Sequence, residues 1–411
     1  MPPPRMNLDR LLAPVTREEF FARHWEREPL VVARDDAARY HTLLEASDVE
    51  FVISSACAQK GSVEVLGDSE AGAMPAAADD AAFVLRAFRR GATVRVYGVQ
   101  RLWKPVGTLC GELEQLFGFP VNANLYCTPA DAQGAQLHYD THDVLVLQLA
   151  GRKRWRVFPP LVSLPLTHLP PLPFEERTPL LKYRRGGPRK GRADIKEEDC
   201  GELLRDLTLA AGDLLYLPRG FVHEARTAEE LSVHLTLGVH VLTWLDLLTV
   251  ALGQAANRDE RFRRALPAGL HLGAGRDLNA QLDALLEAFR QQTDARAALD
   301  EVAESFVRHR QSLGDGVLTD PPAPADLRAD TPLERRPGLL CRFVERGATA
   351  GLASAHAELW MPANFAPALR FVAGADRFRA ADLPGPMSDE SKLALARRLI
   401  QDGFLRVEPA E

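Results

Sequence analysis

QLHYDTHDVLVLQLAGRKRWRVF, residues 136–158, is the stretch of the sequence that decides the fold. Its second part, residues 144–158, is rich in β-branched, aromatic and leucine residues and contains one turn signal, Ala150-Gly151, which predicts two paired strands. We therefore expect His138 and Asp140 to lie on a strand or at its entry. Because they are two residues apart, their side chains should project from the same face of that strand.

A histidine and a carboxylate on one face supply two of the three ligands of the 2-His-1-carboxylate triad. This triad holds non-haem Fe(II) and leaves coordination positions open. The third ligand must come from elsewhere in the chain, and the candidate is His223, which follows a short apolar strand and a Pro-Arg-Gly turn. In a barrel of short antiparallel strands, a late strand can return beside an early one. An isolated His-x-Asp pattern is common, so the metal site is a hypothesis at this point.

A cluster of cations follows the turn at Gly151. Lys153 is flanked by Arg152, Arg154 and Arg156. An exposed basic face of a strand would explain all four, and we expect it to hold for at least two of them. A lone cation inside the strand pattern would instead support a site for a negatively charged ligand.

Several short motifs occur together in this chain: NLYCTP at 124–129, QG at 133–134, HYD at 138–140, GRKRWR at 151–156 and GDLLYLPRGFVH at 212–223. The combination is specific, and it resembles the ribosomal oxygenases. These are cupin-fold, JmjC-type protein hydroxylases that depend on Fe(II) and 2-oxoglutarate. The resemblance extends over most of the chain.

The resemblance implies that Fe(II) is bound by three side chains, His138, Asp140 and His223. It also implies that 2-oxoglutarate chelates the metal through its keto acid end and that Lys153 pairs with the far carboxylate through a charge-assisted hydrogen bond. O2 would be the second cosubstrate. The pocket would be completed by Asn124, Tyr126 and Thr128.

Two other histidines are rival ligands. His234 could compete for the third position and His142 for the first, although a place in the core would explain both. We prefer His223 because of its family-like Pro-Arg-Gly-x-x-His context. The chain departs from the family at Gly238, where a hydroxyl residue is usual. That departure puts in doubt a side-chain hydrogen bond to the cosubstrate from this position, but it leaves the iron site intact.

Composition limits the class of protein. The chain has 411 residues, of which 46% are hydrophobic and 26% charged, as is ordinary for a globular protein of two or three domains. A net charge of −6 gives no reason to expect nucleic acid or membrane as a partner. The 5 cysteines include no Cys-x-x-Cys pair, which argues against disulfides and a thiolate zinc site. Without a membrane-length apolar run, we expect a cytoplasmic protein.

The expected fold mixes α and β structure: a double-stranded β-helix (cupin or jelly-roll) barrel, a helical unit and a winged-helix-like end domain. Strand signals recur at 122–127, 144–149, 154–158, 207–209, 213–217 and 231–241. The predicted domains are an α/β lead-in packing on the barrel (1–120), a JmjC/cupin catalytic barrel (121–242) with an insertion (159–206), a helical unit (243–312), a linker (313–337) and the winged-helix-like domain (338–411).

Three of these regions bear on partners. The basic segment 182–192 is expected to be a solvated loop or else a lid that touches substrate. The apolar faces of the helices predicted within 243–312 could be buried inside the monomer, whereas the resemblance implies that these helices form a homodimer. The end helix after Ser388 has balanced charges, so we expect no direct binding to DNA.

Three functions follow. We favour an oxygenase that hydroxylates a side chain of a protein, such as a ribosomal protein, or of a peptide, including a small ribosomally made peptide. The alternative from another class is a metal-free or zinc-loaded cupin that serves as a binding module. A weaker alternative is a JmjC-type lysine demethylase.

Overall fold

The computed structural model describes residues 5–67, 76–77, 80–134, 136–166, 195–266, 268, 278–310 and 326–408. The chain divides into two compact units, Met1–Val241 and Leu242–Glu411, and each is treated by itself. No helix in the described ranges is both long enough and apolar enough to cross a bilayer. The basic segment 182–192 lies outside the described residues.

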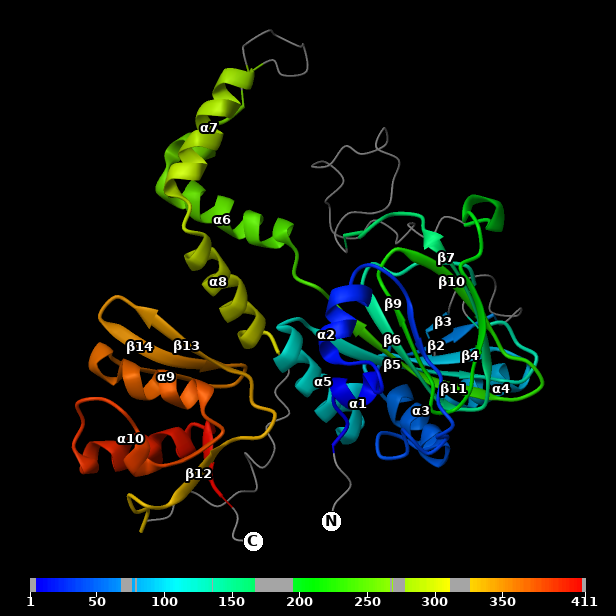
Figure 1. Cartoon of the computed structure of the whole chain (residues 1–411), viewed down its shortest axis with the longest axis horizontal. Coiled ribbons are helices and arrows are strands. Elements are labelled where there is room, and N and C mark those ends of the chain that lie inside the picture. The colour runs from blue at the N-terminus through cyan, green and yellow to red at the C-terminus, as the bar shows by residue number, and fades with distance from the viewer. Residues whose placement is uncertain are drawn as a thin grey trace. The chain divides into compact units, whose positions relative to one another are not determined.

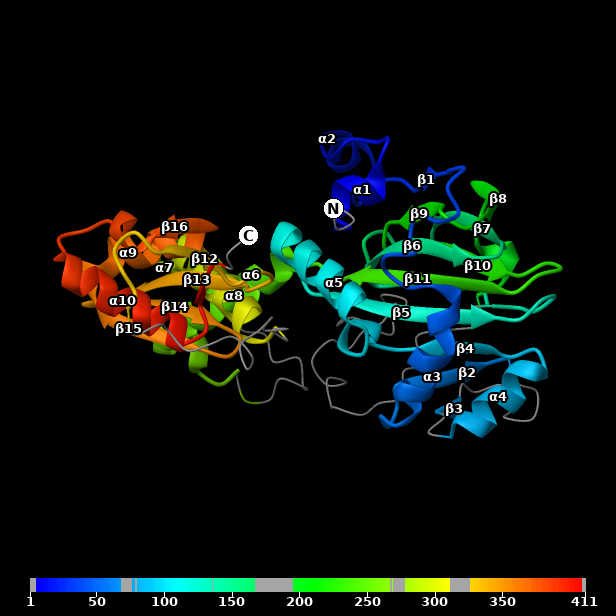
Figure 2. The ribbon, with the colours of Figure 1, turned by 90° about the horizontal axis from the view of Figure 1, so that it is seen from below.

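An eight-stranded antiparallel sheet dominates the first unit. Figure 2 shows its strands side by side in the order β1-β9-β6-β11-β5-β4-β2-β3. Strands that are distant in sequence thus become neighbours, as in a double-stranded β-helix. The strands are β1 (Leu30–Val32), β2 (Val63–Leu66), β3 (Ala76–Ala77), β4 (Thr93–Val96), β5 (Val121–Thr128), β6 (Asp143–Ala150), β9 (Leu214–Leu217) and β11 (Ser232–Val239).

A smaller antiparallel sheet, ordered β10-β7-β8, packs against one face of the large sheet. Its strands are β7 (Lys153–Pro160), β8 (Arg205–Leu209) and β10 (Phe221–Arg226). Buried apolar side chains from both sheets meet in one cluster, so the two sheets enclose a common interior: Val144, Val146, Trp155, Val157, Leu209, Leu215, Leu217, Phe221 and Ala225.

Helices cover the other face of the large sheet (Figure 1). They are α1 (Leu8–Leu12), α3 (Val49–Cys57), α4 (Ala81–Arg89) and α5 (Lys104–Phe117). The short α2 (Arg17–Glu19) has no buried residue and leads into a π-helical turn, Phe20–His24. The Thr16 hydroxyl accepts a hydrogen bond from Glu19 N at 3.1 Å, which caps the start of α2. Gly118 ends α5 with φ 69°.

The alternation of side chains along β5 and β11 decides which residues enter the interior. Val121, Ala123, Leu125 and Cys127 of β5 belong to the helix-covered core, as do Val233, Leu235, Leu237 and Val239 of β11. Because successive side chains of a strand point to opposite faces, the polar residues between them face the small sheet. This polar inner face positions the candidate site.

The second unit contains three helices followed by two three-stranded sheets, β16-β12-β17 and β13-β14-β15. The helices α6 (Trp244–Arg258), α7 (Leu278–Gln292) and α8 (Ala295–Arg308) come first. The remaining elements are β12 (Pro332–Arg335), β13 (Cys341–Arg346), β14 (Thr349–Ser354), β15 (Glu358–Pro362), α9 (Ala366–Gly374), β16 (Arg377–Arg379), α10 (Asp389–Gln401) and β17 (Leu405–Val407).

Residues 138–140 form an isolated bridge and precede β6, so the His-x-Asp segment lies at the entry of a strand, one of the two positions expected. The structure differs from the sequence predictions at two places. β10 continues the chain where the sequence predicted only a turn out of the preceding strand. The stretch 313–337 is not linker throughout, because β12 pairs with β16 and β17 in the sheet of the end unit.

Candidate metal centre

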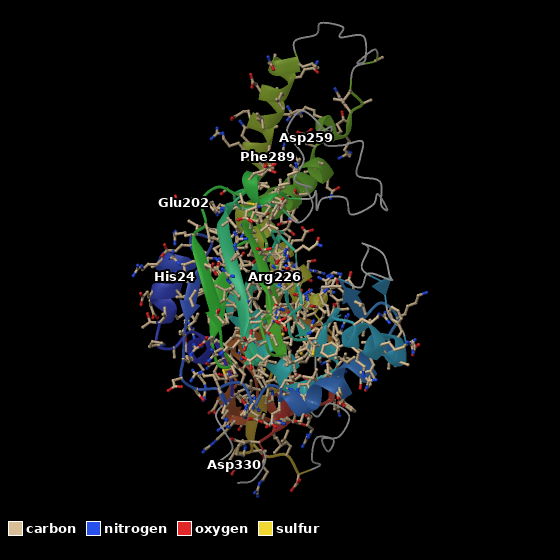
Figure 3. The ribbon with its side chains drawn as sticks, turned by 90° about the vertical axis from the view of Figure 1, so that its right-hand side faces the viewer. His24, Glu202, Arg226, Asp259, Phe289 and Asp330 are labelled. Carbon is tan, nitrogen blue, oxygen red and sulfur yellow. The ribbon has the colours of Figure 1, made fainter. Side chains whose placement is uncertain are left out.

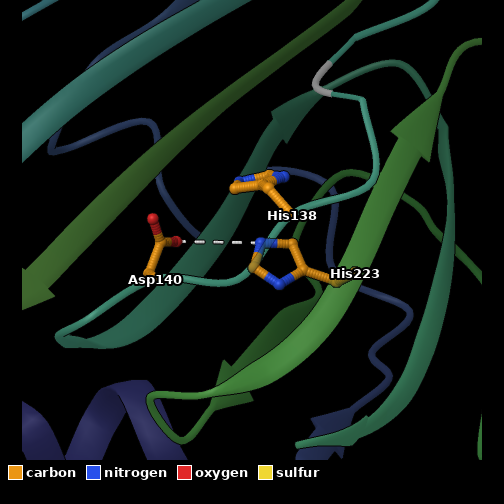
Figure 4. Close-up of side chains that lie close together, drawn as sticks. All are labelled: His138, Asp140 and His223. Atoms are coloured by element: carbon orange, nitrogen blue, oxygen red, sulfur yellow. Dashed lines mark ion pairs between the residues drawn. The ribbon is translucent and has the colours of Figure 1, made fainter. Parts of the chain in front are cut away.

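Three ligand-type side chains converge in the first unit (Figure 4). Potential ligand atoms of His138, Asp140 and His223 all lie within 4.8 Å of one another. His223 Nε2 is 3.7 Å from Asp140 Oδ2, and the centroids of the two imidazoles are 4.3 Å apart. Both histidines are buried and Asp140 is half-buried. Among the described residues, no other group of three His, Cys, Asp or Glu side chains is arranged in this way.

Backbone hydrogen bonds place the two histidines opposite each other. His138 N donates to His223 O at 3.0 Å, and His223 N donates to His138 O at 2.8 Å. The register of β10 against β7 shifts between Phe221 and His223, and such an irregularity can re-aim a side chain. Residues far apart in sequence therefore present their imidazoles to one point.

The Nδ1 atom of each imidazole bonds to a backbone carbonyl. His138 Nδ1 lies 2.6 Å from Gln136 O, and His223 Nδ1 lies 3.0 Å from Phe221 O. A carbonyl oxygen can only accept, so each Nδ1 carries the proton and each Nε2 keeps a lone pair. Metal-binding histidines are commonly oriented in this way. Two neutral imidazoles and one carboxylate are a donor set that fits Fe(II).

Lys153 is buried in the same barrel. It begins β7, is 1% exposed, and donates from Nζ to Thr128 Oγ1 at 2.8 Å. No carboxylate of the described residues forms an ion pair with it. Burial lowers the pKa of Lys153 to about 7. A ligand carboxylate would therefore find an ammonium group that the described protein does not neutralise.

The neighbouring cations face the solvent. Arg152 and Arg154 are exposed, and Arg154 forms an ion pair with Asp206. Arg226, which ends β10 and is labelled in Figure 3, is also exposed. The alternation along β7 thus separates Lys153 from the arginines around it.

Among the described residues, buried polar atoms of the inner face without a hydrogen-bond partner include three near Lys153 and the triad: Gln148 Oε1, Trp155 Nε1 and His234 Nδ1. The Trp155 ring lies 5.9 Å from the His223 ring and 5.6 Å from the His234 ring, so it connects the strand of Lys153 with the triad. Buried polar atoms are nearly always paired in native proteins, so these three suit a polar ligand.

The other predicted pocket residues share this inner face. Thr128 contacts Lys153 as above and accepts from Thr93 Oγ1 at 3.1 Å. The Tyr126 ring stacks on the His234 ring with centroids 4.7 Å apart. Asn124 lies farther along β5, where its Oδ1 accepts from Gly98 N at 3.3 Å.

The rival histidines stand apart from the triad. His234 is buried beside Tyr126 and Trp155, and its pKa is well below the usual range because of burial and the nearby charge of Lys153. The His142 ring stacks on the His240 ring at 4.6 Å. Its position also accounts for Gly238: a Cβ there would lie 2.5 Å from Asn122 Oδ1 and 2.6 Å from His142 Cδ2, so these two side chains occupy the space of a side chain at 238.

Sequence reasoning did not single out Gln148 and Trp155. Both lie on strands that the sequence predicted, and their inward direction follows from the period-two alternation with Val144 and Val146 on β6 and with Lys153 on β7. That alternation was the signal that could have identified them.

Comparisons with known proteins found a family match and similar sequences. The JmjC domain family matches residues 103–247. The chain is 32% identical to ribosomal oxygenase 1 of Gallus gallus, over 62% of this chain and 41% of that protein. It is 30% identical to ribosomal oxygenase 2 of Rattus norvegicus, over 75% of this chain and 65% of that protein. It therefore spans less than two thirds of the length of either relative.

Among solved structures, YcfD, a ribosomal oxygenase from Escherichia coli in complex with cobalt and 2-oxoglutarate, is similar with a TM-score of 0.53. The sequences are 17% identical, and the similarity covers 95% of this chain and 98% of that chain, which shows a common fold. Together, the comparisons show that the chain contains a JmjC domain and that its sequence is similar to the ribosomal oxygenases.

Proposed function

We propose that this chain is an Fe(II)- and 2-oxoglutarate-dependent oxygenase that hydroxylates a side chain of a protein or peptide. The observation that carries the proposal is the buried Lys153, which has no carboxylate partner among the described residues and shares a barrel interior with the triad. A structural metal site would not need a second buried charge nearby. A cosubstrate with an acidic group at each end would bind the metal with one end and the Lys153 ammonium with the other.

His138, Asp140 and His223 would hold Fe(II), and Lys153 with Thr128 would hold the far carboxylate of 2-oxoglutarate. When bound, metal and cosubstrate supply the activation of O2, which the protein's own side chains cannot provide. The chain contributes orientation and exclusion of water. Trp155 and His234 would form the wall between the two binding groups, and their orphaned nitrogens offer hydrogen bonds to the ligand or to ordered water.

A ribosomal protein is the substrate class that we propose first, because the sequence relatives are named ribosomal oxygenases. The geometry of the triad serves hydroxylation and oxidative demethylation equally, so the lysine demethylase stays as the weaker alternative. The reaction product separates the two: hydroxylation adds one oxygen atom to the substrate, whereas demethylation releases formaldehyde.

The Asp140→Ala variant tests the enzyme reading. We expect the parent chain, with Fe(II) and 2-oxoglutarate, to form succinate in the presence of purified ribosomal proteins and to add one oxygen atom to one of them, measured by mass spectrometry. Removal of the carboxylate ligand should reduce both signals to the level without protein. Asp35→Ala is the matched control, because Asp35 is exposed, and it should retain full activity.

The alternative, a metal-free or zinc-loaded cupin used for binding, makes the opposite prediction. In that case the parent chain forms no succinate with any of these proteins, and the Asp140→Ala variant has the same activity in the cell as the parent.

The Lys153 ammonium predicts a pH dependence of 2-oxoglutarate binding. With a pKa of about 7, lowered from 10.5 by burial, Lys153 is charged below pH 7 and loses its proton above it. A carboxylate binds the charged form, so affinity should fall above pH 7, by up to about tenfold per pH unit when one proton is taken up. Isothermal titration with Mn(II) in place of Fe(II) measures the dissociation constant.

Lys153→Arg keeps a permanent charge and should remove most of this slope, whereas Lys60→Arg, an exposed control, should keep it. A parent whose affinity for 2-oxoglutarate is flat from about pH 6.5 to about pH 9, which is about two units above the lowered pKa, would contradict the assignment of Lys153.

We further propose that the helices of the second unit form a homodimer and that its end domain is winged-helix-like, without direct DNA binding. Large apolar side chains on the helices are exposed, among them Trp244 at 80%, Leu248 at 50% and Leu282 at 53%. Patches of this kind commonly mark protein interfaces. A cytoplasmic location is a prediction that goes with this function.

The dimer proposal predicts that Leu282→Glu shifts the chain from dimer to monomer in analytical ultracentrifugation, because it buries a charge in an apolar interface. Leu85→Glu, at an exposed leucine of α4, is the control and should leave the mass unchanged. A parent that sediments as a monomer at all tested concentrations would refute the dimer.

A further inference from the structure

Unlike Lys153, a second buried charge has a charged partner within the protein, and it lies on the face of β6 that carries Leu145 and Leu147 of the helix-covered core. Asp143, the first residue of β6, is 0% exposed, and it accepts hydrogen bonds from Tyr216 Oη at 2.7 Å and from Arg219 Nη1 at 3.0 Å. Arg219 is 5% exposed. An ion pair this deeply buried is costly to desolvate, and removing one partner would leave the other charge uncompensated.

The N-terminal segment completes the network. Glu26 accepts a hydrogen bond from Arg219 Nη1, and its backbone N donates to Tyr216 Oη at 3.0 Å. Its φ of 57° is unusual for a residue other than glycine. Trp25 stacks on the Tyr216 ring with centroids 6.0 Å apart. The groups that face Arg219 thus come from three separate segments of the chain.

Two of these segments carry the triad. Asp143 lies three residues after Asp140, and Arg219 lies four residues before His223. Gly220 N, next to Arg219, donates to Asp140 O at 2.9 Å. Gly220 has φ 92°, and a Cβ there would lie 2.1 Å from Val162 O, so the turn between Arg219 and His223 has little freedom. The ion pair therefore ties the turn before the third ligand to the segment with the first two.

We propose that Arg219, acting through Asp143, is a positioning residue for the metal centre: the pair fixes the distance between the His138–Asp140 segment and His223. The inference rests on the proposed function. It assigns no contact between Arg219 and the metal. Without Arg219, the contacts that still join the two segments include the hydrogen bond from Tyr216 Oη to Asp143 and the backbone hydrogen bonds, but the buried charge of Asp143 loses its arginine partner.

The experiment is a titration of the purified full chain with Co(II) alone, followed by visible absorption. The intensity of the Co(II) bands reports coordination geometry, and the titration gives the affinity. We expect Arg219→Gln to bind Co(II) about 10- to 100-fold more weakly, the range seen when supports of metal ligands are removed, and with altered band intensities. Arg219→Lys, which keeps a cation beside Asp143, should recover part of the loss.

Two further variants separate positioning from stability. Arg34→Gln removes a half-buried arginine that bonds to the carbonyls of Ala13 and Gly212, away from the triad, and it should lower the melting temperature while leaving Co(II) affinity unchanged. The double variant Asp143→Asn with Arg219→Gln removes both buried charges. It should regain much of the melting temperature lost in Arg219→Gln but none of the Co(II) affinity.

Three results would overturn the proposal. Arg219→Gln could bind Co(II) with parental affinity and spectrum, which leaves the proposed function intact. The double variant could regain affinity together with stability, which would make the network merely structural. A parent that binds no Co(II) would remove the metal centre itself and, with it, both this inference and the proposed function.

Discussion

The alternation of apolar and polar side chains along β5, β6 and β11 is the constraint on which the site depends. One face of these strands is apolar and is covered by helices, and the other supplies Thr128, Gln148 and His234 to a closed interior. A shift of one residue in register would exchange the two faces. The core under the helices and the polar interior are therefore two results of one pattern, and neither could change alone.

Two buried charges, one on the helix-covered face of β6 and one in the barrel interior, are compensated in different ways. Asp143 is balanced by Arg219 and Tyr216 within the protein, and Glu26 extends that network to the N-terminal segment. Lys153 donates a hydrogen bond to the Thr128 hydroxyl, and no carboxylate of the described residues forms an ion pair with it. The first arrangement suits a fixed support, because an arginine and a tyrosine of the protein already compensate the carboxylate. The second suits a binding group, because its charge is compensated only when an anion arrives.

Much of the barrel could be predicted from the sequence, because its strands are strongly β-prone and bounded by turn signals. The predicted strand at 144–149 lies within β6, and the proximity of His138, Asp140 and His223 followed from the motifs. The register shift between Phe221 and His223 could not be predicted, because it depends on the pairing of β10 with β7. The reason for a glycine at 238 could not be predicted either, because only the folded chain shows that the His142 ring lies where a side chain at 238 would be. The assignment of these residues to Fe(II) and 2-oxoglutarate is a proposal.

We propose that one barrel interior binds a metal and a 2-oxoacid together. The most direct measurement is visible absorption of the purified chain with Fe(II) and 2-oxoglutarate in the absence of oxygen. We predict a metal-to-ligand charge-transfer band that is lost in His138→Ala and needs more 2-oxoglutarate in Lys153→Ala. No band in the parent, with zinc retained or no metal bound, would contradict the account and would indicate a barrel used for binding alone.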